Sequence, residues 1–252
     1  MKSPIISHIS LTSSDRSNSS DSVSNFSYRL PNPIRDCIGV AIDCINFPVT
    51  YYTVMTGIND TIVIDVSSTD YTATLDPGIY TIAELVTEAQ TQIRAAYTVD
   101  NLHAVALDAT TQKITISHSS TSFSIEWSTT GSAYKLMGFN NSDTSAATSH
   151  VAPNIFNLTH GNFVHIISNK LTPQNNIIGN NWRNTLFILP LDQDFGTFKT
   201  YINQGQNFAY TYSSPLNLYE IDLKLEFEDG NEIPLNGVDW SISIRMLRSG
   251  KN

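Results

Sequence analysis

The strongest constraint on the fold is a two-residue alternation of apolar and polar side chains near the end of the chain. In residues 219 to 227, every second side chain is apolar and the ones between are charged. A turn at 228 to 231 follows, and residues 238 to 246 repeat the alternation. Because successive side chains of a strand point to opposite faces, each segment has one apolar face. The two segments predict an antiparallel hairpin that covers a core.

Further strands are predicted along most of the chain. Pro31 and Pro33 should end the first of them. So many short strands, without a regular alternation with helices, indicate an antiparallel sandwich. We predict an all-β fold, an antiparallel jelly-roll sandwich with a small α/β insertion of a helix plus a hairpin. The other predicted strands are 26–30, 38–45, 62–66, 163–168, 186–191 and 208–212.

The insertion is predicted from a change of period at residue 82. Apolar residues then recur at helical spacing as far as Tyr97, and Thr81 with Glu84 forms a capping box at the start. Candidate strands follow, and Gly138 can close a short helical turn. The predicted domains are an N-terminal arm, a sandwich in two pieces and the insertion: 1–22, 23–74 with 141–252, and 75–140.

The arm is predicted from a polar stretch. Residues 10 to 25 are dominated by Ser, Asn and Asp, with too little apolar surface to offset the entropy of ordering. This segment either stays mobile or becomes ordered against a partner.

Charge excludes a surface that follows nucleic-acid phosphates. The chain has 23 acidic and 14 basic residues, a net charge of −9, and no basic cluster. Charged residues make up only 15% of the chain, and an uncharged polar surface is the kind that neighbours cover at low cost. An extracellular β protein is the alternative from composition.

Cysteines and apolar runs bear on the compartment. Cys37 and Cys44 are the two cysteines, and we expect them on opposite faces of a strand and unpaired. The absence of a disulfide framework fits a reducing compartment. The first residues lack the apolar stretch of a signal peptide, and no apolar run is long enough to span a membrane.

We find no constellation of residues that specifies catalysis, a cofactor or a metal, and we predict that the chain is not an enzyme. The six histidines are scattered. A metal site from His160 and His165 with Asp192 or Asp194 has no supporting ligand spacing. A glycoside hydrolase using Asp192 and Asp194 is the weakest alternative.

Aromatic side chains in predicted loops suggest a contact surface. Tyr51, Tyr52 and Trp182 lie between predicted strands, where exposed aromatics often make contacts. With Asp15 and Arg16 of the arm, they are our candidate interface residues. Capping of the sandwich ends is an equally good reading of the aromatics.

Several blocks of the sequence form a recognisable set: residues 14–16, 25–30 and 40–52 at the start of the chain, then 77–81 with 84–85, 136–139, 223–227 with 229–230, and 238–241. Together they resemble penton and minor capsid proteins of large eukaryotic DNA viruses and virophages. The resemblance implies a jelly-roll capsid protein without an active site.

The function expected from this resemblance is that of a structural subunit at the vertex of an icosahedral double-stranded DNA virus, acting by self-assembly. Its expected partners are itself, as a homopentamer, the major capsid protein and other minor capsid proteins, without direct nucleic-acid contact. The expected location is the virion, assembled in the host cell cytoplasm. Two alternatives stay open: another minor (cement) capsid protein, and a receptor- or glycan-binding spike module using loops such as 48–60 and 169–184.

Overall fold

The chain folds into two compact units. The computed structural model describes residues 5–172, 176–178, 181–204 and 209–250. Unit 1 comprises Met1–Tyr51 with Gly161–Asn252, and unit 2 comprises Tyr52–His160. No helix within the described ranges is long and apolar enough to cross a bilayer.

Unit 1 is an antiparallel β-sandwich, which confirms the predicted fold class. Its described strands form a seven-stranded sheet in the order β1-β15-β2-β14-β9-β12, with β13 also paired to β2, and a separate β10-β11 hairpin. The elements are β1 Ile5–Thr12, η1 Ser13–Asp15, β2 Asn25–Pro48, β9 Phe163–Ile167, β10 Asn176–Ile178, β11 Asn181–Arg183, β12 Thr185–Pro190, β13 Phe198–Ile202, β14 Ala209–Glu226 and β15 Ser241–Arg248.

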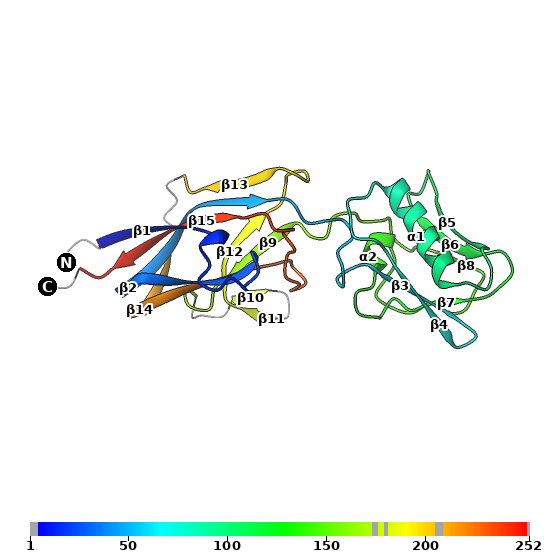
Figure 1. Cartoon of the computed structure of the whole chain (residues 1–252), viewed down its shortest axis with the longest axis horizontal. Helices are drawn as coiled ribbons and strands as arrows, with labels where there is room; N and C mark the ends of the chain where they lie inside the picture. Colours follow the sequence, from blue (N-terminus) through cyan, green and yellow to red (C-terminus); the bar gives the residue numbers. More distant parts are fainter. Residues whose placement is uncertain (1–4, 173–175, 179–180, 205–208, 251–252) are drawn as a thin grey trace. The chain divides into compact units, whose positions relative to one another are not determined.

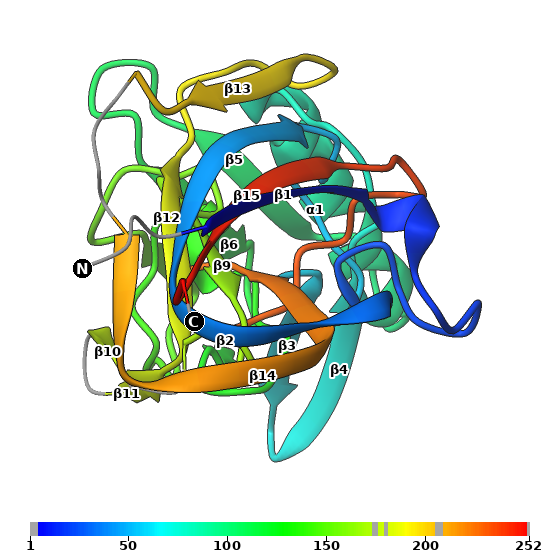
Figure 2. The same cartoon turned by 90° about the vertical axis from the view of Figure 1, so that its left-hand side faces the viewer.

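Two long strands, β2 and β14, belong to both layers of the sandwich. The first half of β2 pairs with the second half of β14, and the second half of β2 pairs with β15 and β13. Figure 2 shows the two layers, one with β13, β15 and β1 beside β2, the other with β14 beside the start of β2. Near the crossing, a Cβ added to Gly39 would lie 2.6 Å from the Tyr210 carbonyl oxygen, so the backbones approach too closely there for a side chain.

The prediction that Pro31 and Pro33 end a strand is wrong. β2 runs through both prolines, and its pairing with β14 changes register in this region, between Leu216 and Leu218 and again before Glu220. Proline has no backbone N–H, and irregular pairing tolerates that loss better than a regular ladder does.

The described part of the predicted arm is a strand of the sandwich, which corrects the prediction for residues 1–22. β1 pairs with β15 from Ile5, opposite Arg248, to Thr12, opposite Ser241. Leu11 is buried and the Ser13 hydroxyl donates a hydrogen bond to Asp239. The strand is held by a partner at the other end of the sequence, from Ser241 to Arg248, which sequence composition does not reveal.

Trp240 anchors the core of unit 1. It is 2% exposed, its indole N–H donates to the Val23 carbonyl at 2.8 Å, and its ring contacts Phe26 edge-on at 6.0 Å. The segment between η1 and β2 is therefore held against the core. Cys37 and Cys44 are both free thiols, as predicted.

Unit 2 packs a helix against two three-stranded sheets, in the orders β4-β3-β7 and β5-β6-β8. Its core includes Leu85, Ala89 and Ile93 of the helix and Trp127. The described elements are β3 Thr61–Val66, β4 Thr69–Thr74, α1 Ile82–Ala96, β5 His103–Leu107, β6 Ile114–His118, β7 Ser124–Ile125, α2 Tyr134–Met137 and β8 Ser149–Val151.

The boundaries of this unit differ from the predicted insertion, 75–140. β3 pairs with β4 and with β7, which places residues 61–74 in unit 2 instead of the sandwich. β8 extends the unit beyond 140 by pairing with β6. The β3–β7 and β6–β8 pairings join segments that are well separated in sequence, so local patterns did not show them, whereas β3 and β4 form a hairpin of neighbouring segments.

The predicted local signals of unit 2 are confirmed. The Glu84 N–H donates to the Thr81 hydroxyl at 3.4 Å, and the Thr81 N–H donates to the Glu84 carboxylate at 2.8 Å. The Thr81 N–H and the Thr81 hydroxyl both donate to the Glu84 carboxylate, and these two bonds lower the pKa of Glu84, the bond from the backbone N–H most. Gly138 ends α2 in the left-handed conformation, with φ of 77°.

Thr81→Ala should destabilise unit 2 by about 1 kcal/mol, because it removes an N-cap hydroxyl. Thermal unfolding followed by circular dichroism measures the change. Thr87→Ala is the matched control, since that hydroxyl bonds only to the Ala83 carbonyl within the helix. Equal effects of the two variants would contradict the capping role.

Candidate functional site

Three edge strands of unit 1 lack the charges that normally protect an exposed edge. β1 and β12 contain no Asp, Glu, Lys or Arg, and β13 contains only Lys199. The Lys199 ammonium lies 2.5 Å from the Asp192 carboxylate, so its charge is already paired. Natural proteins place charges, prolines or bulges on edge strands to prevent pairing with other chains. β12 has such devices, since it ends at Pro190 and its pairing with β9 is irregular between Thr185 and Phe187. β1 and β13 pair in regular register and contain no proline, and edges of this kind are typical of strands that a partner covers.

The surface formed by β12, β13 and their adjoining segments, hereafter the β12–β13 flank, is also apolar. Six large side chains there are between 39 and 62% exposed. Isolated exposed apolar residues are ordinary, but several on adjoining segments indicate a contact surface. They are Phe163, Ile188, Phe195, Phe198, Ile202 and Tyr210.

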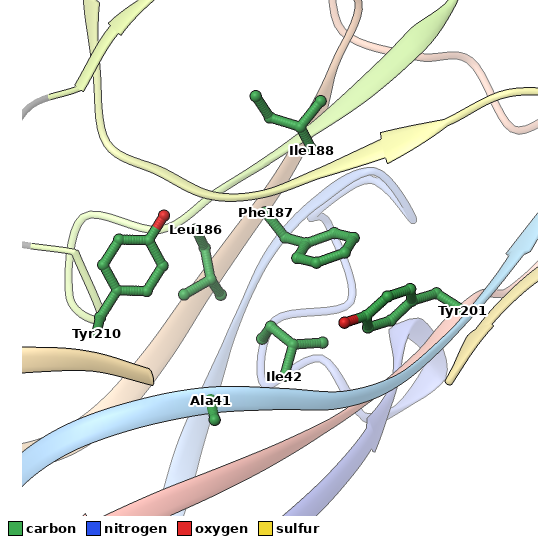
Figure 3. Close-up of a pocket in the computed structure, with 7 residues that line it drawn as sticks. All are labelled: Ala41, Ile42, Leu186, Phe187, Ile188, Tyr201 and Tyr210. Carbon is green, nitrogen blue, oxygen red and sulfur yellow. The ribbon is translucent and has the colours of Figure 1, made fainter. Parts of the chain in front are cut away.

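A pocket of about 670 Å³ opens on this flank. Figure 3 shows Phe187 and Tyr201 from opposite walls, with ring centroids 4.5 Å apart. The Tyr210 hydroxyl donates to the Thr185 carbonyl at 3.1 Å, which ties β14 to β12 beside the pocket. The lining residues are Ala41, Ile42, Leu186, Phe187, Ile188, Tyr201 and Tyr210. Such a lining suits apolar side chains and offers no charged group for catalysis.

Of the predicted interface residues, Asp15, Arg16, Tyr51 and Tyr52 are not among the described residues that line this pocket. Asp15 accepts a hydrogen bond from the Thr12 N–H at 2.8 Å, and Arg16 donates to the Ser13 carbonyl at 2.9 Å. These two residues therefore shape the η1 turn.

The aromatic candidates have different positions. Tyr51 packs edge-on against Phe227 at 5.1 Å, and burial raises the pKa of its hydroxyl. Tyr52 is partly buried at the start of unit 2. Trp182 is in β11, opposite Ile177, and its side chain is outside the described residues. Tyr51 thus supports the sandwich end, the other reading that the sequence left open.

The acidic pair considered for hydrolysis is not arranged as two free carboxylates. Asp192 follows β12, and its pKa is lowered, chiefly by the hydrogen bond from Lys199 and then by that from Gln193. A carboxylate stabilised in its charged form is a poor general acid at neutral pH.

A cluster of Asp100, His103 and His118 in unit 2 has the residue types of a metal site. However, Nδ1 of His118 accepts hydrogen bonds from the N–H groups of Ser120 and Thr121, at 3.2 and 2.8 Å. Nε2 therefore carries the proton of the neutral ring and donates it to Asp100 at 3.0 Å. A metal on Nε2 would need an anionic imidazole, so the donor set does not fit.

His103 is the buried, neutral member of this cluster. It is fully buried, and neither ring nitrogen has a hydrogen-bond partner among the described residues. The ring packs between Tyr97, His118 and Phe123, with centroids 4.6 to 5.0 Å away. Burial, and next the neighbouring His118, lowers the pKa of His103 to about 4, although Asp100 acts in the opposite direction.

His103 should make unit 2 sensitive to acid. Between pH 6.5 and about 4 the unfolded chain binds a proton that the folded chain excludes. The stability that neutral His103 contributes is therefore fully present above pH 6.5, and roughly 3 kcal/mol of the free energy of unfolding is lost as the pH drops through this range. His103→Phe should reduce this loss. Urea unfolding at pH 7.5, 5.5 and 4.5 tests it, and parallel losses in variant and wild type would contradict the assignment.

The solved structures that match this chain include two viral proteins. A chain of the Sputnik virophage matches with 12% identity and a TM-score of 0.46, covering 98% of both chains. The mavirus penton protein matches with 10% identity and a TM-score of 0.46, covering 98% of this chain and 99% of that one. No family model and no curated protein matches.

Proposed function

We propose that this chain is a structural, non-enzymatic capsid subunit, and that it forms the five-membered ring at a vertex of an icosahedral double-stranded DNA virus. The observation that carries the proposal is the set of edges with few charges: β1 and β12 contain no charged residue, β13 contains only the paired Lys199, and an apolar pocket lies at the β12–β13 flank. A chain that works as a free monomer would have to protect such edges, whereas a shell subunit covers them with its neighbours.

The distribution of charge supports contacts through unit 1. Unit 1 carries 11 basic and 13 acidic residues, while unit 2 carries 3 basic and 10 acidic residues. Copies of unit 2 repel one another, and copies of unit 1 are close to neutral. The proposed partners are sister copies, the major capsid protein and other minor capsid proteins, in the virion after assembly in the host cytoplasm. Direct nucleic-acid contact is not part of the proposal, because unit 2 is strongly acidic.

The purified chain should form assemblies five times its mass of 27.9 kDa. Each contact should bury about 1,200 to 2,000 Å², the range of stable interfaces. Mass photometry measures the assembly, and a map of the particle then locates the chain by its symmetry axis. A particle with this chain only away from the fivefold axes would favour a cement protein over a vertex protein.

A receptor-binding role is a second candidate, favoured by a groove of about 260 Å³ in unit 2. Nε2 of His150 donates to the Phe123 carbonyl at 2.8 Å, which leaves the Nδ1 lone pair of the neutral ring as an acceptor. Asp143 is the one carboxylate among the described lining residues, and no Lys or Arg lines the groove there. This chemistry suits a neutral hydroxylated ligand such as a sugar ring.

Glycan-array binding tests this second function. Binding that is lost in Asn140→Ala, which removes an amide from the groove rim, would support it. An array without any bound glycan would count against it and would leave the capsid proposal unaffected.

A further inference from the structure

We propose that sister copies join head to tail, with the β1 edge of one copy packed against the β12–β13 flank of the next. The inference rests on the proposed function and specifies the two surfaces that would close the ring. The occupant of the apolar pocket is then a second copy of this chain, contributing side chains of its β1 edge.

The two surfaces lie at opposite ends of the same sheet. β1 begins the strand order of unit 1 and β12 ends it, while β13 pairs with β2 on the side away from β15. Figure 2 shows β12 and β13 together on one side of the unit, and the turn after β1 on the other. A contact between two different surfaces is heterologous, and repeated rotation by the same angle can close it into a ring.

Both surfaces expose apolar side chains at an edge. On β1, Ile5 and Ile6 are 51 and 50% exposed. On β13, Phe198 and Ile202 are exposed on the same face, because the strand alternates exposed and partly buried residues. Ile5 and Ile6 point to opposite faces of β1, so one of them can face the flank, where its packing beside Phe198 and Ile202 would remove apolar surface from water.

The charges near the two surfaces are largely compensated. Beside β1, Arg245 is paired with Asp43 at 3.1 Å, and Asp36 adjoins Cys37, the cross-strand partner of Arg248. Next to β13, Lys199 is paired with Asp192. Neither surface therefore carries a large net charge that would oppose the packing of its apolar side chains against the other.

Backbone groups add to the match. Within the described strands, β1 pairs only with β15 and β13 only with β2. Each strand thus has a side without a neighbouring strand, where another extended chain can form hydrogen bonds. The proposed contact uses surfaces of unit 1 alone.

The test uses the full chain and two variants, each altered on one surface. Ile5→Asp with Ile6→Asp changes the β1 edge, and Phe198→Asp with Ile202→Asp changes the flank. All four side chains are at least half exposed, and circular dichroism confirms folding. The corresponding Ser substitutions replace any variant that fails to fold. Ile155→Asp, a 62% exposed isoleucine of unit 2, is the matched control.

Mass photometry of each sample and of their equimolar mixture distinguishes the possible contacts. We expect rings for wild type and control, and monomers for each double variant at concentrations ten times higher. The mixture should give 1:1 dimers and nothing larger. The flank variant keeps an unaltered β1 edge and the β1 variant keeps an unaltered flank, so one contact forms between them and no further surface is available.

Other outcomes would overturn the inference in distinguishable ways. Rings that persist in both variants would reject these surfaces and leave the capsid function standing. If only the flank variant fails to assemble and the mixture gives no mixed dimer, the contact is symmetric. A wild-type chain that stays monomeric at every concentration would reject the ring itself, and the contact with it.

Discussion

The antiparallel pairing of β2 with β14 is the interaction on which the sandwich depends. Both strands are long enough to cross from one layer to the other, and they remain paired, with shifts of register, on both sides of the crossing. Every other strand of the main sheet joins β2 or β14 directly or through one intermediate strand. The place where the backbones approach most closely requires Gly39, since a Cβ there would meet the Tyr210 carbonyl.

This framework explains why the apolar flank exists. β13 and the start of β14 occupy successive parts of the same side of β2, and β12 ends the other layer. The layers therefore end in two edges that no strand of the described chain joins. Side chains from both layers line the space between them, and Phe187 meets Tyr201 there. An apolar surface on the described residues thus follows from the way the sheet stops.

Local sequence patterns predicted the elements that local interactions build. The α1 capping box, the Gly138 turn and the strands at 163–168 and 186–191 were recognisable because their signals lie within a few residues. β1 was mistaken for part of an arm because its partner, β15, is at the far end of the sequence. β13 was missed because only five residues form it and its outer face is exposed and apolar instead of polar.

The β12–β13 flank could not be identified from the sequence. Sequence reasoning chose aromatic residues in loops, of which Tyr51 packs against Phe227, and their role at an interface stays a prediction. The absence of charge from residues 185–191 points to a sheet edge only once the strand is known to be terminal in its sheet. Edge position is a property of topology, so no single segment reveals it.

The pairing of the first strand with the last has a consequence for biosynthesis. A chain emerging from the ribosome can complete unit 2 while β1 and β2 still wait for β14 and β15. The sandwich closes only after translation has passed Arg248. Polypeptides that terminate before β15 would lack this closing strand and hence a finished sandwich.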